Sequence, residues 1–461
     1  MLRVFPALLA ALVLCAGCER PFIEPVSPTV ELVSPEDLSV VRSEPELPLA
    51  FRASTSFGTV GRIEVNGEAT TFVSGDDLFL DTLRLEDGLN RIVVEAFGEG
   101  DTVGGDTLFA LYLPAAFVET DARLPDGLGG HAAVTLADGP TLFTGGATSA
   151  TAPALSLALR FDPDRFDFSV LPRQMIEARA GHAASLLPDG RVLLTGGGRT
   201  ATPTDIDDLV TTVELFDPNA GTFTAVPVVA EDGGPIDPVQ RTEHTVTVLQ
   251  GDGGVVVVLL YGGLGNVGSE SNPRLGPLPF MRRLVFEDSP EGPRLVAPDR
   301  SDGFRFTSIA RHTQTPLAGV GPDGFGRYLV AGTSPPDDPD IAAPFELFFA
   351  SDRLDALPVG APSMARTDHA AAPLDGGLVL GTGGVAPGGT TTPDGSDVSA
   401  TGEVFADEAG QFFRFEPNVR LAVPRWGHTA TNLDDGRILL VGGFSASGQA
   451  LPFTELFVGS P

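Results

Sequence analysis

Histidine is the residue type in this sequence best suited to chemistry, and all six copies stand in the same repeated context. An imidazole can ligate a metal ion or move a proton near neutral pH. Each histidine opens a phrase that continues with an apolar run, a turn, a second apolar run, a glycine-rich step and a Phe-containing strand. The copies are His131, His182, His244, His312, His369 and His428, which lie 51, 62, 68, 57 and 59 residues apart. This spacing predicts a repeat protein in which each copy builds one small unit.

The repeat that begins at His182 shows the content of one unit most clearly. Its histidine is followed by an apolar run, a Pro-Asp-Gly turn, a second apolar run at 191–195 and the diglycine Gly196-Gly197. Two further runs, 213–217 and 222–226, follow after a loop. Short apolar runs separated by turn signals are typical of antiparallel strands, so each repeat predicts one four-stranded sheet. Six such sheets predict an all-β ring.

A circle of six histidines could hold a metal ion, but its regularity favours a structural role. Arginine stands three residues before the histidine in four repeats, and a glutamate lies in the third strand of several, as at Glu214, Glu403 and Glu455. A functional site usually breaks the symmetry of a repeat, whereas packing between sheets preserves it. We therefore expect these arginines and histidines to satisfy buried backbone groups or to pair with the glutamates. The residues assigned to this structural role are Arg179, His182, Arg241, His244, Arg366, His369, Arg425 and His428.

The two ends of the repeat region predict how the ring closes. The sixth repeat stops after its third strand, near Leu456, whereas residues 116–120 form a strand-like run before the first repeat. Pairing of these two segments would complete the sixth sheet and remove two unpaired strand edges. We therefore expect a ring that is sealed head to tail.

The recurring diglycine, followed by a Glu-Leu-Phe strand, resembles the kelch family of six-bladed β-propellers. The resemblance covers residues 115–461 and implies six four-stranded blades; Ala331-Gly332 in the fourth repeat departs from the pattern. Some kelch propellers are radical copper oxidases resembling galactose oxidase, which need a tyrosine cross-linked to a cysteine. After removal of a leader this sequence keeps one cysteine, Cys18, so that cofactor is not expected. We predict no catalytic residue, no cofactor and no metal ligand.

The first residues predict the compartment. One arginine, an apolar run from Val4 to Leu14 and small residues before Cys18 are typical of a secretory signal peptide over residues 1–17. The residues before Cys18 resemble the lipobox of bacterial lipoproteins, which implies lipidation of Cys18 and a tether over 18–28. An ordinary cleaved signal is the alternative. Glu19, where Asp would retain a lipoprotein, implies sorting to the outer membrane, so we predict a lipid-anchored protein of the bacterial cell envelope.

Residues 29–114 predict a separate small β domain ahead of the repeats. Six or seven short alternating runs occur there, with turn signals such as Asn66-Gly67 between them. This is the size of an immunoglobulin-like sandwich. Phrases within it resemble bacterial Ig-like modules, which implies a spacer role. The fold class predicted for the chain is therefore all-β, with a small Ig-like β-sandwich at 29–114 and a six-bladed kelch-type β-propeller at 115–461.

The charge balance excludes several partners and reactions. The sequence has 29 Lys and Arg against 61 Asp and Glu, a formal net charge of −32, and every basic residue is arginine. Such a surface repels nucleic acid and anionic lipid headgroups, so membrane contact is expected only through the N-terminal lipid. Schiff-base catalysis requires a lysine side chain, and the sequence contains none.

Long loops provide the functional hypothesis. The loops after the diglycines and between repeats are long, and alternating strand direction places them on one face, which we predict to be the binding face. Solvated charge is one interpretation of the acidic clusters on these loops, and a calcium site is the alternative. The candidate binding residues are Asp205, Asp207, Asp208, Asp337, Asp338, Asp340, Asp394 and Asp397.

These patterns together predict a monomeric, non-enzymatic recognition or scaffold module of the cell envelope, whose partner is a protein or a glycan. A carbohydrate-active enzyme that uses acids on the same face is the alternative hypothesis, and a purely structural envelope protein is a third. The sequence has no G-x-S-x-G phrase, and no pair of carboxylates stands out for glycosidase chemistry.

Overall fold

The computed structural model describes residues 27–459 with gaps at 36–37, 39, 56–58, 74–77, 100–101, 235–239, 270, 299–307, 321–325, 333–344, 350–353, 361, 363–365 and 387–397. The described residues form an all-β fold of strands and short 3-10 turns, without an α-helix. Contacts divide the chain into two compact units. Unit 1 consists of Met1–Glu36, Pro48–Leu83 and Arg91–Leu108, and unit 2 of Asp37–Leu47, Arg84–Asn90 and Phe109–Pro461.

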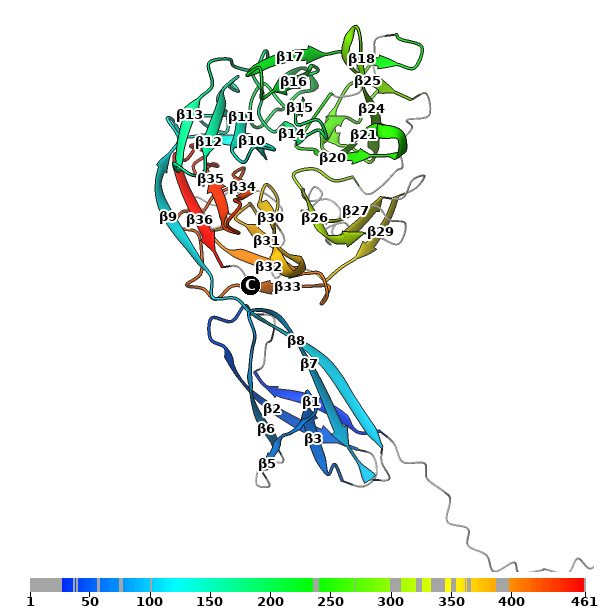
Figure 1. Ribbon diagram of the computed structural model, residues 1–461, viewed down its shortest axis with the longest axis vertical. Helices are drawn as coiled ribbons and strands as arrows, with labels where there is room; N and C mark the ends of the chain where they lie inside the picture. The colour runs from blue at the N-terminus through cyan, green and yellow to red at the C-terminus, as the bar shows by residue number, and fades with distance from the viewer. Residues whose placement is uncertain are drawn as a thin grey trace, which may run out of the picture. The chain divides into compact units, whose positions relative to one another are not determined.

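The strands of the N-terminal region form two four-stranded sheets (Figure 1). One has the order β1 (Thr29–Ser34), β2 (Glu46–Ser54), β6 (Leu78–Arg84), β5 (Thr71–Val73), and the other β4 (Glu68–Ala69), β3 (Arg62–Val65), β7 (Gly88–Phe97), β8 (Val103–Tyr112). In β7 the buried residues Ile92, Val94 and Ala96 alternate with less buried neighbours. This period of two is what a strand with one face in a core requires.

Six further sheets are formed by the repeats, and we number them in chain order. Sheets 1 to 3 are β10 (Gly129–Thr135), β11 (Thr141–Ala147), β12 (Ala158–Asp162), β13 (Asp167–Val170); β14 (Ala183–Leu186), β15 (Val192–Thr195), β16 (Val213–Asp217), β17 (Thr222–Val226); and β20 (Thr245–Gln250), β21 (Val256–Tyr261), β24 (Met281–Ser289), β25 (Gly292–Ala297). Sheet 3 gains a fifth strand, β18 (Val228–Ala230), which pairs in parallel with β25.

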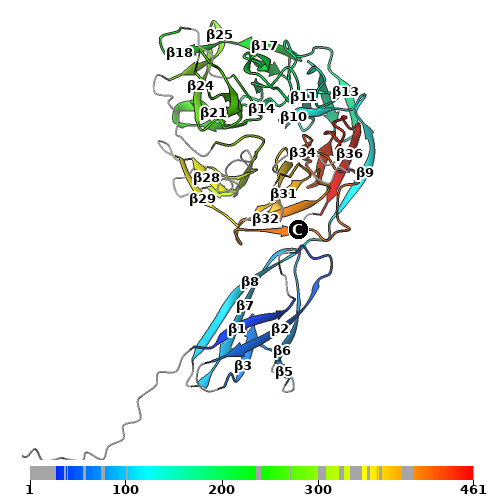
Figure 2. The same cartoon turned by 180° about the vertical axis from the view of Figure 1, so that it is seen from behind.

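Sheets 4 to 6 continue the same pattern. They are β26 (Thr313–Val320), β27 (Gly326–Ala331), β28 (Phe345–Phe349), β29 (Leu354–Pro358); β30 (Ala370–Leu374), β31 (Leu378–Thr382), β32 (Gly402–Ala406), β33 (Gln411–Arg414); and β34 (Thr429–Asn432), β35 (Ile438–Val441), β36 (Phe453–Val458), β9 (Ala116–Arg123). Figures 1 and 2 show the six sheets following one another in chain order around a circle. A small sheet of β19 (Arg241–Thr242), β22 (Leu264–Asn266) and β23 (Leu275–Pro277) lies in the loops of the third repeat.

Each interface between neighbouring sheets contains its own apolar core. The second strand of every sheet supplies two adjacent buried residues, and successive side chains of a strand point to opposite faces, so one residue packs on each neighbour. The second strands are therefore continuously apolar, as strands buried on both faces are. The packed pairs around the circle are Leu142 with Leu194, Leu193 with Leu260, Leu259 with Val330, Leu329 with Val379, Leu380 with Leu440, and Leu439 with Phe143.

The predicted pairing of the two ends of the repeat region is confirmed. Strand β9 pairs antiparallel with β36, with Phe117 opposite Phe457 and Val118 opposite Leu456. The rings of Phe117 and Phe457 lie 5.2 Å apart, and Phe457 is fully buried. The last strand of the chain thus completes its sheet with the strand that precedes the first repeat.

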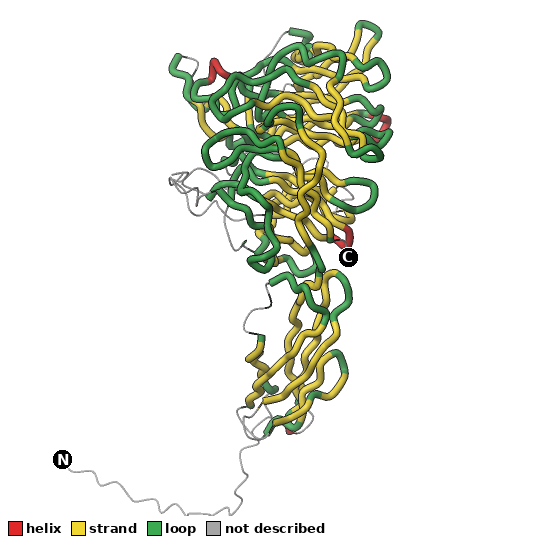
Figure 3. Tube along the Cα trace, turned by 90° about the vertical axis from the view of Figure 1, so that its left-hand side faces the viewer, coloured by secondary structure: helices red, strands yellow, loops and turns green. Residues whose placement is uncertain are grey.

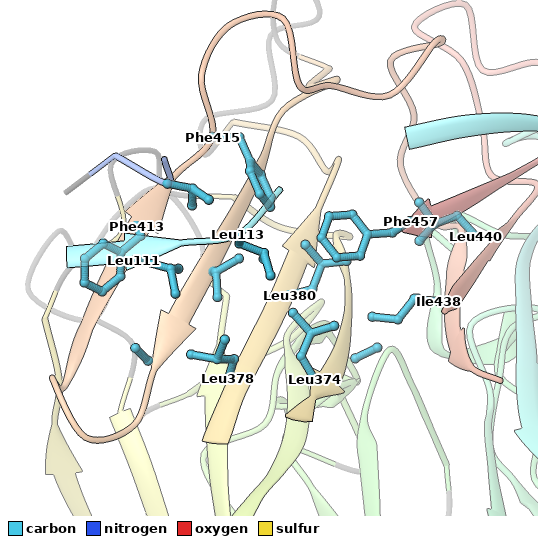
Figure 4. Close-up of a cluster of buried hydrophobic side chains, with 14 of the residues drawn as sticks. Leu111, Leu113, Leu374, Leu378, Leu380, Phe413, Phe415, Ile438, Leu440 and Phe457 are labelled. Carbon is cyan, nitrogen blue, oxygen red and sulfur yellow. The ribbon is translucent and has the colours of Figure 1, made fainter. Parts of the chain in front are cut away.

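Residues ahead of β9 extend the core between sheets 5 and 6. Val41, Leu111 and Leu113 are buried in the same cluster as Phe413 and Phe457, as Figure 4 shows for four of these side chains. The backbone N–H of Val41 donates to the carbonyl of Arg414 at 2.8 Å, so this segment covers the outer edge of β33. Covered edges cannot pair with other chains.

Replacing Phe457 with alanine should destabilise the ring at its seam. The side chain is fully buried between sheets 5 and 6, and a Phe→Ala change in such a core costs about 3–5 kcal/mol. Urea denaturation of F457A should show this loss. The neighbouring Val458 is 41% exposed, so V458A should remain within about 0.5 kcal/mol of the wild type. Equal stability of both variants would contradict a seam held by this core.

Candidate functional site

A closed cycle of backbone hydrogen bonds links the six sheets at their inner strands. The residue directly before each histidine has a left-handed backbone, with φ between 52° and 65°. Its N–H donates to the carbonyl of the equivalent residue in the preceding sheet, at 2.7–3.2 Å. The N–H of Gly130 donates to Gly427 at 2.8 Å and so joins the first repeat to the last. We call these residues the inner cycle; they are Gly130, Gly181, Glu243, Arg311, Asp368 and Gly427.

The inner cycle breaks the symmetry of the repeats. Glycine, which adopts a left-handed backbone without strain, occupies it in sheets 1, 2 and 6. Sheets 3, 4 and 5 place Glu243, Arg311 and Asp368 in the same conformation, at a cost of roughly 1–2 kcal/mol for each non-glycine residue. Strain that a glycine would relieve is typical of residues retained for function.

These three side chains form a charged arc. Arg311 Nε donates to Glu243 Oε2 at 2.8 Å, and Arg311 Nη1 lies 3.8 Å from Asp368 Oδ2. The carboxylates are largely buried, whereas 38% of the Arg311 side chain is exposed. Burial raises the pKa of Glu243 to about 7, against the opposing effect of the Arg311 guanidinium, and burial also raises the pKa of Asp368. The arc therefore offers a solvent-accessible guanidinium held between two acids.

The other half of the inner cycle is apolar. Trp426, the only tryptophan in the chain, is half-buried and packs at a tilt against the fully buried Phe444 with ring centres 4.6 Å apart. A Cβ atom on Gly129 would lie 2.7 Å from three ring atoms of Phe444, so glycine is required there. Trp426 precedes Gly427, whose N–H donates to the carbonyl of Asp368. The aromatic pair therefore adjoins the charged arc.

The six histidines hold neighbouring sheets together. Nε2 of each one makes a hydrogen bond of 2.9–3.0 Å with a threonine hydroxyl of the preceding sheet. Burial lowers the pKa of every one, to about 4 for His131 and about 3 for His312 and His369. They are therefore neutral near pH 7. The pairs are His131–Thr429, His182–Thr144, His244–Thr195, His312–Thr245, His369–Thr313 and His428–Thr382.

The threonines were not predicted from the sequence, although the repeats contain a signal for them. Each repeat has one such threonine. In sheets 1, 2 and 5 it stands directly before the diglycine, and alanine follows the histidine. In sheets 3, 4 and 6 it directly follows the histidine, and another residue stands before the glycine. The two positions lie opposite one another on neighbouring strands, as Ala183 with Thr195 and Thr245 with Tyr261. Either position brings the threonine hydroxyl within hydrogen-bond distance of the histidine in the next sheet, so the two arrangements are equivalent.

The diglycines permit close approach between sheets. The N–H of Gly146 donates to the carbonyl of Arg179 in the next sheet at 2.9 Å. A Cβ atom on the preceding Gly145 would lie 2.1 Å from that carbonyl oxygen. Four other sheets repeat the hydrogen bond from Gly197, Gly263, Gly384 and Gly443.

Three of the four predicted structural arginines pair with a glutamate of the third strand. Arg179 Nη2 lies 2.6 Å from Glu214 Oε1, both side chains are buried, and Glu214 also accepts from the backbone N–H of Ile176 and Glu177. Arg366 pairs with Glu403 at 3.4 Å, and Arg425 pairs with Glu455. Arg241 instead donates to the carbonyls of Gly262 and Leu260.

The predicted acidic residues that the structure describes do not belong to the charged arc. Asp205 caps the 3-10 turn Ile206–Asp208, and the Asp208 carboxylate accepts from the N–H of Thr204 and Asp205, so both serve their own loop. Asp207 is exposed in this turn. Cys18, Asp337, Asp338, Asp340, Asp394 and Asp397 lie outside the described residues.

Metal-binding clusters and membrane-spanning helices are both absent from the described residues. In this part of the chain no three His, Cys, Asp or Glu side chains gather closely enough to hold a metal ion. Nor does any helix there have the length and apolar character needed to cross a membrane.

Comparison with known proteins gives a structural likeness. No protein-family model matches the chain, and no curated protein matches it. Among solved structures it is similar to one titled "Structure of YjhT", at 14% identity, over 74% of this chain and 99% of that chain, with a TM-score of 0.48. At this level of overlap the likeness does not extend to function.

Replacing Thr195 with alanine should leave the buried His244 Nε2 without its partner. An unsatisfied buried polar group costs about 1–3 kcal/mol, which urea denaturation can measure. The double variant A183T/T195A moves the hydroxyl to the position used in sheets 3, 4 and 6, and it should recover part of the loss. T195A with wild-type stability would contradict a role for this hydrogen bond.

The stability of the protein should fall in acid between pH 6.5 and about 4. The folded pKa of the histidines is lowered, so the unfolded chain binds more protons in this window and the free energy of unfolding rises with pH. Each histidine contributes about 1.4 kcal/mol per pH unit. Glu243 and Asp368, with raised pKa values, oppose this slope but are fewer. Denaturation at pH 7.5, 6.5, 5.5 and 4.5 tests the trend, which a flat profile would contradict.

Proposed function

We propose that the chain is a lipid-anchored protein of the bacterial cell envelope in which an Ig-like β-sandwich precedes a six-bladed kelch-type β-propeller. On this proposal the propeller is a non-enzymatic recognition or scaffold module for a protein or glycan partner. The N-terminal leader and Cys18 motif support the location. The closed cycle of six backbone hydrogen bonds and the β9–β36 pairing support the propeller.

The observation that carries the binding proposal is the broken symmetry of the inner cycle. The histidines, threonines and diglycines are used in contacts between sheets, whereas Glu243, Arg311 and Asp368 replace glycine where the backbone favours glycine. We take side chains kept at such positions as candidates for a function beyond ring closure.

The charged arc opens on the face that carries the long loops. The inner cycle precedes the first strand of each sheet, at the same end as the diglycine loops. Figure 3 shows the turn at 206–208, in a diglycine loop, on one side of unit 2 and the turns at 252–254 and 375–377, between first and second strands, on the other. The partner therefore contacts the long-loop face, with the arc and Trp426 at its centre.

Glycine variants of the arc test this proposal without disturbing the ring. The triple variant E243G/R311G/D368G copies the glycines of sheets 1, 2 and 6 and leaves no charge of the arc without its partner, so it should keep wild-type stability while losing at least about tenfold in affinity, roughly 1.4 kcal/mol. The full chain is applied to glycan arrays and cross-linked to envelope proteins to find the partner. R437A, which removes an arginine paired with Asp435 outside the arc, is the matched control. Unchanged binding by the triple variant would contradict the proposal.

The raised pKa of Glu243 favours a second candidate, a carbohydrate-active enzyme on the same face. A carboxyl group with a pKa of about 7 can act as a general acid at neutral pH. Turnover of glycosidic substrates that is abolished by E243Q would establish this candidate in place of the binding module.

A further inference from the structure

A cavity of about 240 Å³ lies between sheets 1 and 2, at the end of the sheets where the short turns are. Leu136 and Leu142 of sheet 1 and Phe216 of sheet 2 line its apolar part, and all three are almost completely buried. The turn at 218–221 in sheet 2 forms another wall. The short turns lie on the face opposite the long loops (Figure 3), so this cavity is separate from the charged arc.

The interface between sheets 6 and 1 has the same apolar residues at the corresponding positions. Three buried side chains form one cluster there, and each matches a side chain that lines the cavity. Each matched pair has the same place relative to the diglycine, or to the turn between the third and fourth strands. The pairs are Leu433 and Leu136, Leu439 and Leu142, and Phe161 and Phe216. The two interfaces can therefore be compared residue by residue.

The two interfaces differ at one position of the turn between the third and fourth strands. Phe166 in sheet 1 and Gly221 in sheet 2 both have a left-handed backbone, with φ of 57° and 63°. The Phe166 ring packs edge-on against Phe161, with ring centres 5.2 Å apart, and the Arg437 guanidinium lies 5.8 Å from its centre. A Cβ atom added to Gly221 would meet no atom of the described residues within 4 Å, apart from its chain neighbours. The cavity therefore occupies the place that the Phe166 ring fills between sheets 6 and 1.

A guanidinium also borders the cavity, although it comes from another strand. Arg160 lies opposite Leu142 in the sheet, lines the cavity and has a side chain that is 43% exposed. Its Nη2 donates to Asp138 Oδ2 at 3.0 Å, and Asp138 also lines the cavity. Guanidinium groups attract the faces of aromatic rings, and between sheets 2 and 3 Arg191 lies 5.4 Å from the centre of the Phe286 ring. The cavity thus combines an apolar floor with a guanidinium and a carboxylate.

We propose that this cavity binds a small aromatic molecule with a polar substituent, whose ring takes the place of the Phe166 ring. A cavity of roughly 150 Å³ with an apolar lining is enough for benzene, so this one has room for a ring and a substituent. The bound ring contacts Phe216, as Phe166 contacts Phe161. Its face lies against Arg160, and a hydroxyl substituent donates to Asp138. The site depends on neither the charged arc nor the partner of the long-loop face.

Phenol and cyclohexanol are the probes that test the site in the full chain. In equilibrium dialysis, phenol should bind saturably with one molecule per chain. Cyclohexanol has a similar size and the same hydroxyl group but no π face, so it should bind at least about twofold more weakly. Phenol uptake without saturation, or equal affinities for the two compounds, would overturn the proposal.

Gly221→Phe is the decisive variant, because the chain then supplies the ring at a backbone angle that Phe166 already adopts. G221F should no longer bind phenol. Gly410 has the same turn position in sheet 5, with φ of 62° and open space among the described residues around an added Cβ atom. Gly410→Phe therefore carries the same backbone strain outside the cavity, and it should bind phenol as the wild type does. Phenol binding retained in G221F, or lost equally in both variants, would overturn the proposal.

A second variant covers the case in which G221F does not fold. Phe166→Gly removes the ring between sheets 6 and 1 and leaves Phe161 and Arg437 beside the space. F166G should bind two phenol molecules per chain, and phenol should raise its Tm more than that of the wild type, because each ligand that binds only the folded state stabilises it. A stoichiometry that stays at one in F166G would overturn the equivalence of the two interfaces, and with it the proposal.

Discussion

The cycle of backbone hydrogen bonds through the residues before the six histidines is the constraint on which the ring depends. Each of these residues must adopt a left-handed backbone so that its N–H points to the carbonyl of the sheet before it. That geometry sets where each first strand begins. It thereby places the histidine beside the threonine of its neighbour, and the diglycine beside the next carbonyl. The pairing of β9 with β36 allows the cycle to close, because it brings Gly130 next to Gly427.

Backbone atoms form the hydrogen bonds that close the ring, so the side chains of the inner cycle can differ from sheet to sheet. Three positions are glycine, and the neighbouring Phe444 fills space that any side chain on Gly129 would take. The other three carry the arc of Glu243, Arg311 and Asp368, in which one guanidinium lies between two largely buried acids. The same hydrogen-bond cycle thus supports a packed apolar half and a polar half, and only the polar half offers charge to a partner.

Packing between sheets is specified by pairs of residues, so single positions vary while the pair is preserved. The threonine that meets each histidine can stand on either of two opposite strand positions, as at Thr195 and Thr245. The buried pair beside it can be Arg179 with Glu214 or Leu128 with Leu159. Both cases follow from one requirement, that a buried donor or charge has a partner and a buried apolar group has apolar neighbours.

Sequence alone determined the strand content, the six repeats and the joining of their ends, because apolar runs, turn residues and an unpaired strand segment at 116–120 are local features. It also indicated Glu214, Glu403 and Glu455 as partners for arginines. It did not lead to the charged arc: the predicted sites were acidic loops, of which Asp205 and Asp208 serve their own turn. Only the tertiary structure decided that Glu243, Arg311 and Asp368 come together. Their meeting depends on backbone φ angles and on contacts between repeats some sixty residues apart, and neither is encoded in the spacing of residue types within one repeat.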